Sequence, residues 1–374
     1  MPQLKLATLI GTRPELIRLS EIIKKADACF EHVLIHTGQN YDYALNEIFF
    51  KELGIRQPDF HLQVAAENVG HTIGNIIAKS YDLLATIQPD ALLVLGDTNS
   101  VLSTIAAKRL KIPIFHMEAG NRCFDQNVPE EINRKISDHI SDINLAYTEH
   151  SRRYLLSEGF RKDHVFVTGS PLYEVINANL ISIEKSNILQ QLELKAGQYI
   201  LVSLHREENI DLPQHFTQVV KALNAVAEKY TLPLIISTHP RTQKRISDAN
   251  ISFHNLIKNM PPFGMFNYIS LQKNAFIVLS DSGTISEESA ICHFPAISIR
   301  TSTERPEAID AGTIVLGGIN ENDILNAIHT CKTTFTANQR NIPSEYTVPD
   351  VSDKVIRIIQ GYTSVINKET WRKE

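Results

Sequence analysis

Three carboxylates stand where a side chain could carry out acid–base chemistry. Asp97 and Glu118 each follow a short apolar run of strand type, and Glu130 lies just inside a helix that Pro129 opens. A carboxylate can remove a proton from carbon when it is held in place, often with its pKa raised by burial or by a second carboxylate. The sequence therefore predicts a proton-transfer site here, although Glu130 could simply complement the helix dipole.

Basic side chains follow other strand candidates, at positions suited to binding phosphate. Arg13 and Arg18 lie at or just after the start of a helix that follows the first strand, which is a favourable place for an anion. His205 and His239 end two later strands and stand beside arginines. Surface ion pairs are the competing explanation for the arginines. If a diphosphate leaves at this site, these cations are expected to stabilise its charge.

A second helix start, in the later half of the chain, also has residues suited to a diphosphate. Ser282 and Gly283 follow a strand candidate, so backbone N–H groups would face a ligand. Glu288 comes one turn later and could accept hydrogen bonds from ribose hydroxyls. Thr284-x-x-Glu287 also fits a capping box, so this helix start has a purely structural interpretation as well.

The sequence gives no sign of a metal or dinucleotide site. The 14 histidines show no H-x-H or H-E-x-x-H spacing, the four cysteines form no C-x-x-C pair, and no G-x-G-x-x-G follows the first strand. We expect no metal and no cofactor, and we expect His36 and His116 to be core histidines. Scattered cysteines are typical of reduced thiols in a cytosol.

Strand-like apolar runs alternate with helix-length segments along almost the whole chain. The predicted strands are Leu6–Ile10, His32–His36, Ala91–Leu95, Ile114–Met117, Ile143–Ala146, Val165–Thr168, Tyr199–Leu204, Leu232–Ser237, Leu256–Lys258, Phe276–Leu279, Ala296–Ile299 and Thr313–Leu316. This alternation predicts an α/β fold with parallel sheets covered by helices on both faces. Ligands bind beyond the carboxyl ends of such strands, so we expect a cleft lined from two domains.

Two Rossmann-like domains fit a chain of 374 residues. We expect the first at residues 1–172, the second at 173–350, and a final helix at 351–374 that packs back on the first domain. The helix that starts at Pro129 should bury a stripe of Ile132, Ile136, Ile140 and Ile143.

Composition limits the partners of the protein. The formal net charge of −5 argues against a nucleic-acid binder. The N-terminus lacks a signal-peptide pattern, and no apolar run approaches the ~18 residues of a membrane span. We therefore expect a cytoplasmic protein that binds neither nucleic acid nor membrane.

Eight motifs occur in a fixed order: GTRPE (11–15), TGQNYD (37–42), GDT (96–98), EAG-x-R (118–122), PEE-x-NR (129–134), HREEN (205–209), DSG-x-x-x-EE (281–288) and TERPEA-x-x-AGT (303–313). Together they resemble the non-hydrolysing UDP-N-acetylglucosamine 2-epimerase family over nearly the whole chain. The resemblance implies the glycosyltransferase type B architecture, a homodimer and a UDP-N-acetylamino sugar as substrate. It also implies anti elimination of UDP with loss of the C2 proton, followed by re-addition on the opposite face of C2.

The resemblance implies roles for single residues as well. Catalytic roles fall to Asp97, Glu118, Glu130 and His205. Binding of substrate or UDP falls to Arg13, Ser282, Gly283, Glu288 and Arg305, and we expect the same role for Arg18, Arg134 and His239 from their positions. The carboxylates thus belong to the first domain and most of the UDP contacts to the second.

Some positions depart from the residues common in the family. Arg18 replaces lysine, Asn121 leucine, Thr284 glycine, and Ser170-Pro171 asparagine-threonine. These departures resemble a branch that converts UDP-2-acetamido-2,6-dideoxy-L-talose into UDP-N-acetyl-L-fucosamine for capsule or O-antigen synthesis. The alternative substrate pair is UDP-N-acetylglucosamine and UDP-N-acetylmannosamine. A type-B glycosyltransferase, a hydrolysing epimerase and a silent nucleotide-sugar sensor are the alternative kinds of protein.

Overall fold

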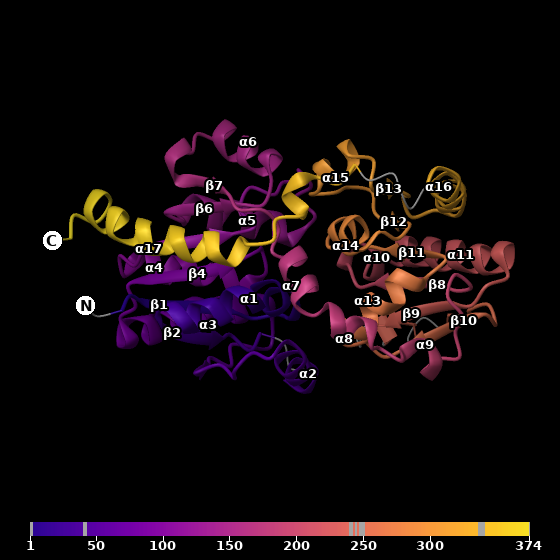
Figure 1. Ribbon diagram of the computed structural model, residues 1–374, viewed down its shortest axis with the longest axis horizontal. Helices are drawn as coiled ribbons and strands as arrows, with labels where there is room; N and C mark the ends of the chain where they lie inside the picture. The colour runs from indigo at the N-terminus through magenta and orange to yellow at the C-terminus, as the bar shows by residue number, and fades with distance from the viewer. Residues whose placement is uncertain are drawn as a thin grey trace. The chain divides into compact units, whose positions relative to one another are not determined.

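The computed structural model describes residues 3–39, 43–238, 242–243, 245–246, 251–335 and 341–373. The chain forms two compact units. Unit 1 consists of Met1–Ala178 and Ser344–Glu374, and unit 2 consists of Asn179–Pro343. In Figure 1 each unit has a sheet flanked by helices.

The described part of unit 1 contains a seven-stranded parallel sheet of order β3-β2-β1-β4-β5-β6-β7. Its strands are β1 (Lys5–Ile10), β2 (Glu31–His36), β3 (Phe60–His61), β4 (Ala91–Leu95), β5 (Ile114–Met117), β6 (Ile143–Ala146) and β7 (Val165–Val167). Its helices are α1 (Arg13–Cys29), α2 (Tyr43–Leu53), α3 (Val69–Ile87), α4 (Ser103–Arg109), α5 (Pro129–Ile140), α6 (Glu149–Ser157), α7 (Leu172–Ala178) and α17 (Val351–Glu369), with short 3₁₀ turns η1 (Asn99–Leu102), η2 (Lys162–His164) and η3 (Ser344–Tyr346). The strand order reverses between β1 and β4, which is where sheets of this kind bind ligands.

The described part of unit 2 contains a six-stranded parallel sheet of order β10-β9-β8-β11-β12-β13. Its strands are β8 (Ile200–Leu204), β9 (Leu234–Thr238), β10 (Ile257–Met260), β11 (Ile277–Ser280), β12 (Ala296–Ser298) and β13 (Val315–Leu316). Its helices are α8 (Leu180–Glu184), α9 (Ile188–Gln191), α10 (Glu207–Ile210), α11 (Pro213–Tyr230), α13 (Met265–Asn274), α14 (Ile285–Cys292), α15 (Pro306–Asp310) and α16 (Glu321–Thr334). The order reverses between β8 and β11, so each unit has its own switch point.

The predicted fold class is confirmed. All twelve predicted strands are present, each within two residues of its expected bounds. The central strands are buried on both faces, which is why their sequences are continuous apolar runs. One strand was missed, since β3 is only two residues long and both are exposed.

The predicted apolar stripe of α5 is wrong. Ile132 is 53% exposed, and Ile136 and Ile140 are only half-buried. Ile143 is buried, but it begins β6 and does not belong to the helix. The buried face of this helix is polar instead, and it consists of Glu131, Asn133, Arg134, Ser137 and Asp138. Buried polar groups must be hydrogen-bonded to offset their desolvation, so this face marks α5 as more than a packing element.

The C-terminal helix α17 packs along α1 within unit 1. Val355, Ile359 and Ile366 recur on one face and are buried. Lys25 of α1 pairs with Asp353 at 2.8 Å. Glu174 of α7 accepts hydrogen bonds from the backbone N–H (2.9 Å) and the hydroxyl of Ser352, and so caps the start of α17. Among the described residues, every helix is too short or too polar to cross a bilayer.

Candidate active site

The two loops at the switch point of unit 1 are held closely together. Glu15 accepts a hydrogen bond from the backbone N–H of Gly11 at 2.6 Å and another from the hydroxyl of Thr98. A side chain at position 11 would place its Cβ 1.8 Å from Oγ of Ser100 and 2.3 Å from Oγ1 of Thr37. Only glycine fits there, so the loop after β1 is fixed against the loop after β4.

Glu15 is buried at this junction, and burial raises its pKa to about 7. Desolvation penalises the carboxylate more than its hydrogen bonds from Thr98 and Gly11 favour it. In the sequence, Glu15 is visible only as the last residue of the GTRPE motif. Its position near the start of a helix could be predicted, but its burial could not.

Glu118, at the end of β5, forms an ion pair with Arg18 of α1. Both side chains are almost buried, and the Arg18 guanidinium lies 5.6 Å from the ring centre of Tyr147. Nδ2 of Asn121 donates to the second oxygen of Glu118 at 3.4 Å. The structure therefore brings together the predicted site residues Glu118 and Arg18 with Asn121, and both Arg18 and Asn121 depart from the common family sequence.

Asp97, at the end of β4, is held by Arg134 of α5. Nε and Nη2 of Arg134 lie 2.8 Å and 2.7 Å from Oδ2 of Asp97, and Nη1 donates to Glu131 at 2.9 Å. This fork orients the Asp97 carboxylate from one side. Glu130 lies on the first turn of the same helix and is half-buried.

The two carboxylate-bearing loops are also neighbours in space. A Cβ at Gly96, the residue before Asp97, would lie 3.5 Å from Oε2 of Glu118. Arg13 is the first residue of α1 and follows the loop after β1. Its guanidinium lies 5.4 Å from the ring centre of Phe49. Unit 1 therefore gathers carboxylates and arginines at the carboxyl edge of its sheet.

His205 follows β8 at the switch point of unit 2. Its Nδ1 lies 3.2 Å from Oδ1 of Asp281, the residue that follows β11. Asp281 is fully buried and also accepts hydrogen bonds from the backbone N–H groups of His205 and Arg206 (3.1 Å and 3.0 Å). Because His205 is 43% exposed, this contact leaves its ring oriented from one side and accessible from the other.

The loop before α14 is close to a buried carboxylate. A Cβ at Gly283 would lie 2.3 Å from Oε1 of Glu304. Glu304 is itself held by Arg206 at 3.2 Å and by Arg300 at 2.6 Å. Ser282 is half-buried, and its Oγ lies 2.9 Å from Oγ1 of Thr284.

The predicted capping box at α14 is wrong. Thr284 has helical backbone angles and makes no side-chain capping hydrogen bond. Glu287 is buried and pairs with Arg305 at 2.9 Å instead of reaching back to the helix start. Glu288 is half-buried, and its Oε2 accepts a hydrogen bond from Nε2 of Gln272 at 2.5 Å.

Comparison with known proteins decides the family. The profile described as UDP-N-acetylglucosamine 2-epimerase matches residues 23–360. The chain belongs to the UDP-N-acetylglucosamine 2-epimerase family. It is therefore a non-hydrolysing isomerase, a UDP-sugar 2-epimerase.

The chain is similar to several named epimerases and solved structures. A UDP-N-acetylglucosamine 2-epimerase structure from Rickettsia bellii is 46% identical, with a TM-score of 0.92, over 99% of this chain and 100% of that chain. The Methanocaldococcus jannaschii enzyme in complex with UDP-GlcNAc and UDP is 33% identical, with a TM-score of 0.90, over 96% and 100%. A Pseudomonas aeruginosa UDP-2,3-diacetamido-2,3-dideoxy-D-glucuronate 2-epimerase is 33% identical over 87% of this chain and 92% of the relative.

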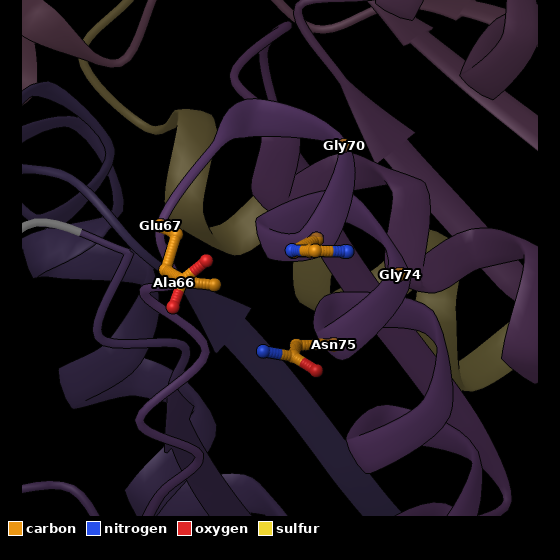
Figure 2. Close-up of a pocket in the computed structure, with 6 residues that line it drawn as sticks. Ala66, Glu67, Gly70, Gly74 and Asn75 are labelled. Atoms are coloured by element: carbon orange, nitrogen blue, oxygen red, sulfur yellow. The ribbon is translucent and has the colours of Figure 1, made fainter.

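An open hollow of about 450 Å³ lies elsewhere on unit 1 of the epimerase. It is lined by Ala66, Glu67, Gly70, His71, Gly74 and Asn75. In Figure 2 the first two lie on the segment before α3, and Gly70, Gly74 and Asn75 lie on the helix. None of the predicted catalytic residues lines this hollow, so we locate the candidate site from its ionisable groups instead.

One predicted residue of the epimerase site, His239, lies outside the described residues. Other features of the site could not be recognised from the sequence. Sequence reasoning missed Glu304 and the ion pairs of Arg134, although both residues fall within recognised motifs. Across the described residues, no group of three or more His, Cys, Asp or Glu side chains is placed to hold a metal ion.

Proposed function

We propose that this epimerase inverts C2 of a UDP-2-acetamido sugar by anti elimination of UDP and re-addition. The observation that carries the proposal is the gathering of Asp97 and Glu118 at neighbouring loops, each paired with an arginine. Removal of the C2 proton needs a carboxylate base, and return of a proton to the opposite face needs an acid. Glu130, on the helix that positions Arg134, is the third candidate.

Departure of UDP requires its negative charge to be stabilised as the bond to C1 breaks. We assign this work to His205 in unit 2 and to Arg13 in unit 1. The backbone of Ser282 and Gly283 would hold the diphosphate, and the carboxylate of Glu288 the ribose. Asp281 supports the role of His205 because it fixes the ring orientation. Arg305 and His239 remain proposed substrate contacts.

As the substrate we propose UDP-2-acetamido-2,6-dideoxy-L-talose, with UDP-N-acetyl-L-fucosamine as product. Two positions that depart from the common family sequence, Arg18 and Asn121, both contact Glu118. A changed set of donors around a proposed acid/base residue is expected if the sugar presents a different stereochemistry.

UDP-N-acetylglucosamine is the competing substrate, and the relatives favour it. The Rickettsia bellii structure, at 46% identity, is named as a UDP-N-acetylglucosamine 2-epimerase. Yet the Pseudomonas aeruginosa relative acts, by its name, on a different sugar at 33% identity, the same level as the Methanocaldococcus jannaschii enzyme. Identity at this level therefore does not decide the sugar.

Proton NMR in D₂O with each UDP-sugar tests the proposal. We expect deuterium at C2 and formation of the epimer from the 6-deoxy-L-talose derivative. Deuterium exchange at C2 with UDP-N-acetylglucosamine alone would show that this sugar is the substrate and would support the same mechanism. Free sugar accumulating beside UDP, or no exchange with either compound, would contradict the mechanism.

We also propose that the protein is a cytoplasmic homodimer that supplies a sugar for capsule or O-antigen synthesis. This proposal rests on the resemblance described above and on the nucleotide-sugar substrate. Light scattering on the purified protein measures the oligomeric state, and a mass of 42.1 kDa, that of a single chain, would contradict the dimer.

A further inference from the structure

Asp138 of α5 is a fully buried carboxylate with several donors around it. It accepts a hydrogen bond from Nη1 of Arg122 at 2.7 Å and lies 2.9 Å from Nδ1 of His116. The backbone N–H of Gly120 lies 3.3 Å and 3.2 Å from its two oxygens. A buried charge with this many partners is costly to assemble, so its place in the fold matters.

The partners of Asp138 surround Glu118 in the sequence. His116 comes two residues before it, Gly120 two residues after it, and Arg122 four residues after it. Glu118 itself has a φ of 63°, a backbone conformation that side-chain-bearing residues rarely adopt. Such a conformation persists only where the surroundings enforce it, and here Asp138 makes contacts on both sides of it.

His116 extends these contacts to the loop that carries Asp97. Its Nε2 lies 2.8 Å from the carbonyl oxygen of Gly96, the residue before Asp97. The carbonyl oxygen of Gly96 can only accept a hydrogen bond, so Nε2 of His116 donates to it, while Nδ1 faces the Asp138 carboxylate at 2.9 Å.

The charges in this cluster balance one another. Burial lowers the pKa of His116, but the hydrogen bond and charge of Asp138, with smaller contributions from Gly96 and Glu118, raise it above its ordinary value. Burial raises the pKa of Asp138, and His116 and Arg122 more than offset this and hold it low. Arg122 in turn pairs with Glu158 at 2.7 Å. Each charge in the cluster therefore favours the ionised form of its partner.

We propose that Asp138 is a positioning residue for the epimerase reaction. Through Gly120 and Arg122 it fixes the loop that holds Glu118, and through His116 it fixes the loop that holds Asp97. The two carboxylates are thereby kept in one mutual geometry. The inference rests on the proposed function, because it takes Glu118 and Asp97 as the acid/base pair.

Asp142 provides a matched control. It is also a buried aspartate, and it contacts the start of β5, whereas Asp138 contacts the end of that strand. Asp142 accepts a hydrogen bond from the backbone N–H of Ile114 at 3.0 Å and another from Lys108 at 2.6 Å. Asp138→Asn and Asp142→Asn should both lower the melting temperature. Only Asp138→Asn should also lower the rate of C2 deuterium exchange, by about 10- to 100-fold beyond any effect of the control, because small misplacements of reacting groups cost rates of this size.

The dissociation constant for UDP gives a readout that loss of folded protein would change and loss of positioning would not. We expect it to stay within about twofold of wild type in folded Asp138→Asn. Equal exchange rates in the two variants, or parallel losses of UDP binding and exchange, would overturn the proposal. If Asp138→Asn does not fold, His116→Gln replaces it, and wild-type exchange in that variant would overturn the proposal. Absence of exchange in the wild-type protein would instead refute the proposed function.

Discussion

Gly283 is required by the side chain that faces it. The Oε1 atom of Glu304 lies 2.3 Å from where a Cβ would stand, well inside contact distance. Glu304 cannot easily move aside, because Arg206 and Arg300 hold both of its oxygens. Any side chain at position 283 must therefore displace either this ion-paired carboxylate or the loop itself.

Gly283→Ala should weaken UDP binding by about tenfold or more, because the loop proposed to hold the diphosphate would shift. Isothermal titration with UDP measures this. Gly361→Ala is the control, since among the described residues no atom lies within 4 Å of a Cβ there, and alanine favours the helix by about 1 kcal/mol. Unchanged UDP affinity in Gly283→Ala would remove the loop from the phosphate site.

The proposed acid/base carboxylates should be separable from binding. Asp97→Asn, Glu118→Gln and Glu130→Gln should each lower turnover by about 10²- to 10⁴-fold while leaving UDP affinity largely intact. Deuterium exchange at C2 and a UDP titration on the same preparations give the two numbers. A variant that lost UDP affinity instead would show that its carboxylate positions the substrate.

At the scale of elements, the junction of β1, α1 and the loop after β4 should make stability depend on pH. Glu15 has a pKa of about 7 when folded, against 4.5 for an unperturbed glutamate. Below pH 4.5 both states are protonated and the folded state suffers no penalty. As pH rises to about 7 the unfolded chain loses its proton first, so stability falls by about 3 kcal/mol at most.

Glu15→Gln should remove that loss. The amide can accept from Gly11 and donate to Thr98, so the fold should be retained. Relative to wild type, the variant should gain stability between pH 4.5 and pH 8, measured by urea unfolding. Glu31→Gln controls for loss of a surface carboxylate. A difference that stays constant with pH would contradict the buried, protonated Glu15.

His36, at the end of β2, acts in the opposite direction over part of this range. Burial, with the nearby His61, lowers the pKa of His36 to about 4, so the folded state resists protonation and loses stability as pH falls below about 6.5. Nδ1 of His36 accepts a hydrogen bond from the backbone N–H of Gly38 at 3.0 Å, as a neutral ring should. Comparing Glu15→Gln with wild type cancels this contribution, because both proteins contain His36.

The strands could be predicted from the sequence because a strand buried on both faces leaves a continuous apolar run. The positions of Asp97, Glu118 and His205 at the carboxyl ends of strands could be predicted because each follows an apolar run of strand type. The buried face of α5 could not, because Arg134 and Asp138 are satisfied by partners 37 and 16 residues away. The periodicity of a helical sequence carries no information about partners so distant along the chain.

At the scale of the whole molecule, unit 2 is an insertion into unit 1. Its residues are continuous in sequence, whereas unit 1 combines residues 1–178 with 344–374. The sheet and core of unit 2 are built wholly from its own elements, including β8, β9, β11, α11 and α16. Unit 1 depends on α17, whose buried Val355, Ile359 and Ile366 would each contribute roughly 1.5–3 kcal/mol.

Residues 179–343 should therefore fold alone, while deletion of residues 351–374 should unfold or strongly destabilise unit 1. The lost burial is comparable with the ~5–15 kcal/mol of a whole domain. Circular dichroism during heating should show a cooperative transition for the fragment and a lowered transition for the truncated chain. A fragment without a cooperative transition, or a truncated chain with wild-type melting, would contradict this division.

The insertion also sets the order in which the protein can be completed during translation. A ribosome that adds about 5–20 residues per second needs roughly 8 to 33 s to synthesise the 165 residues of unit 2. Throughout that time the face of α1 that α17 will cover remains open. Unit 1, which carries Asp97 and Glu118, is thus started before unit 2 and gains the packing of α17 on α1 only after unit 2 has been synthesised.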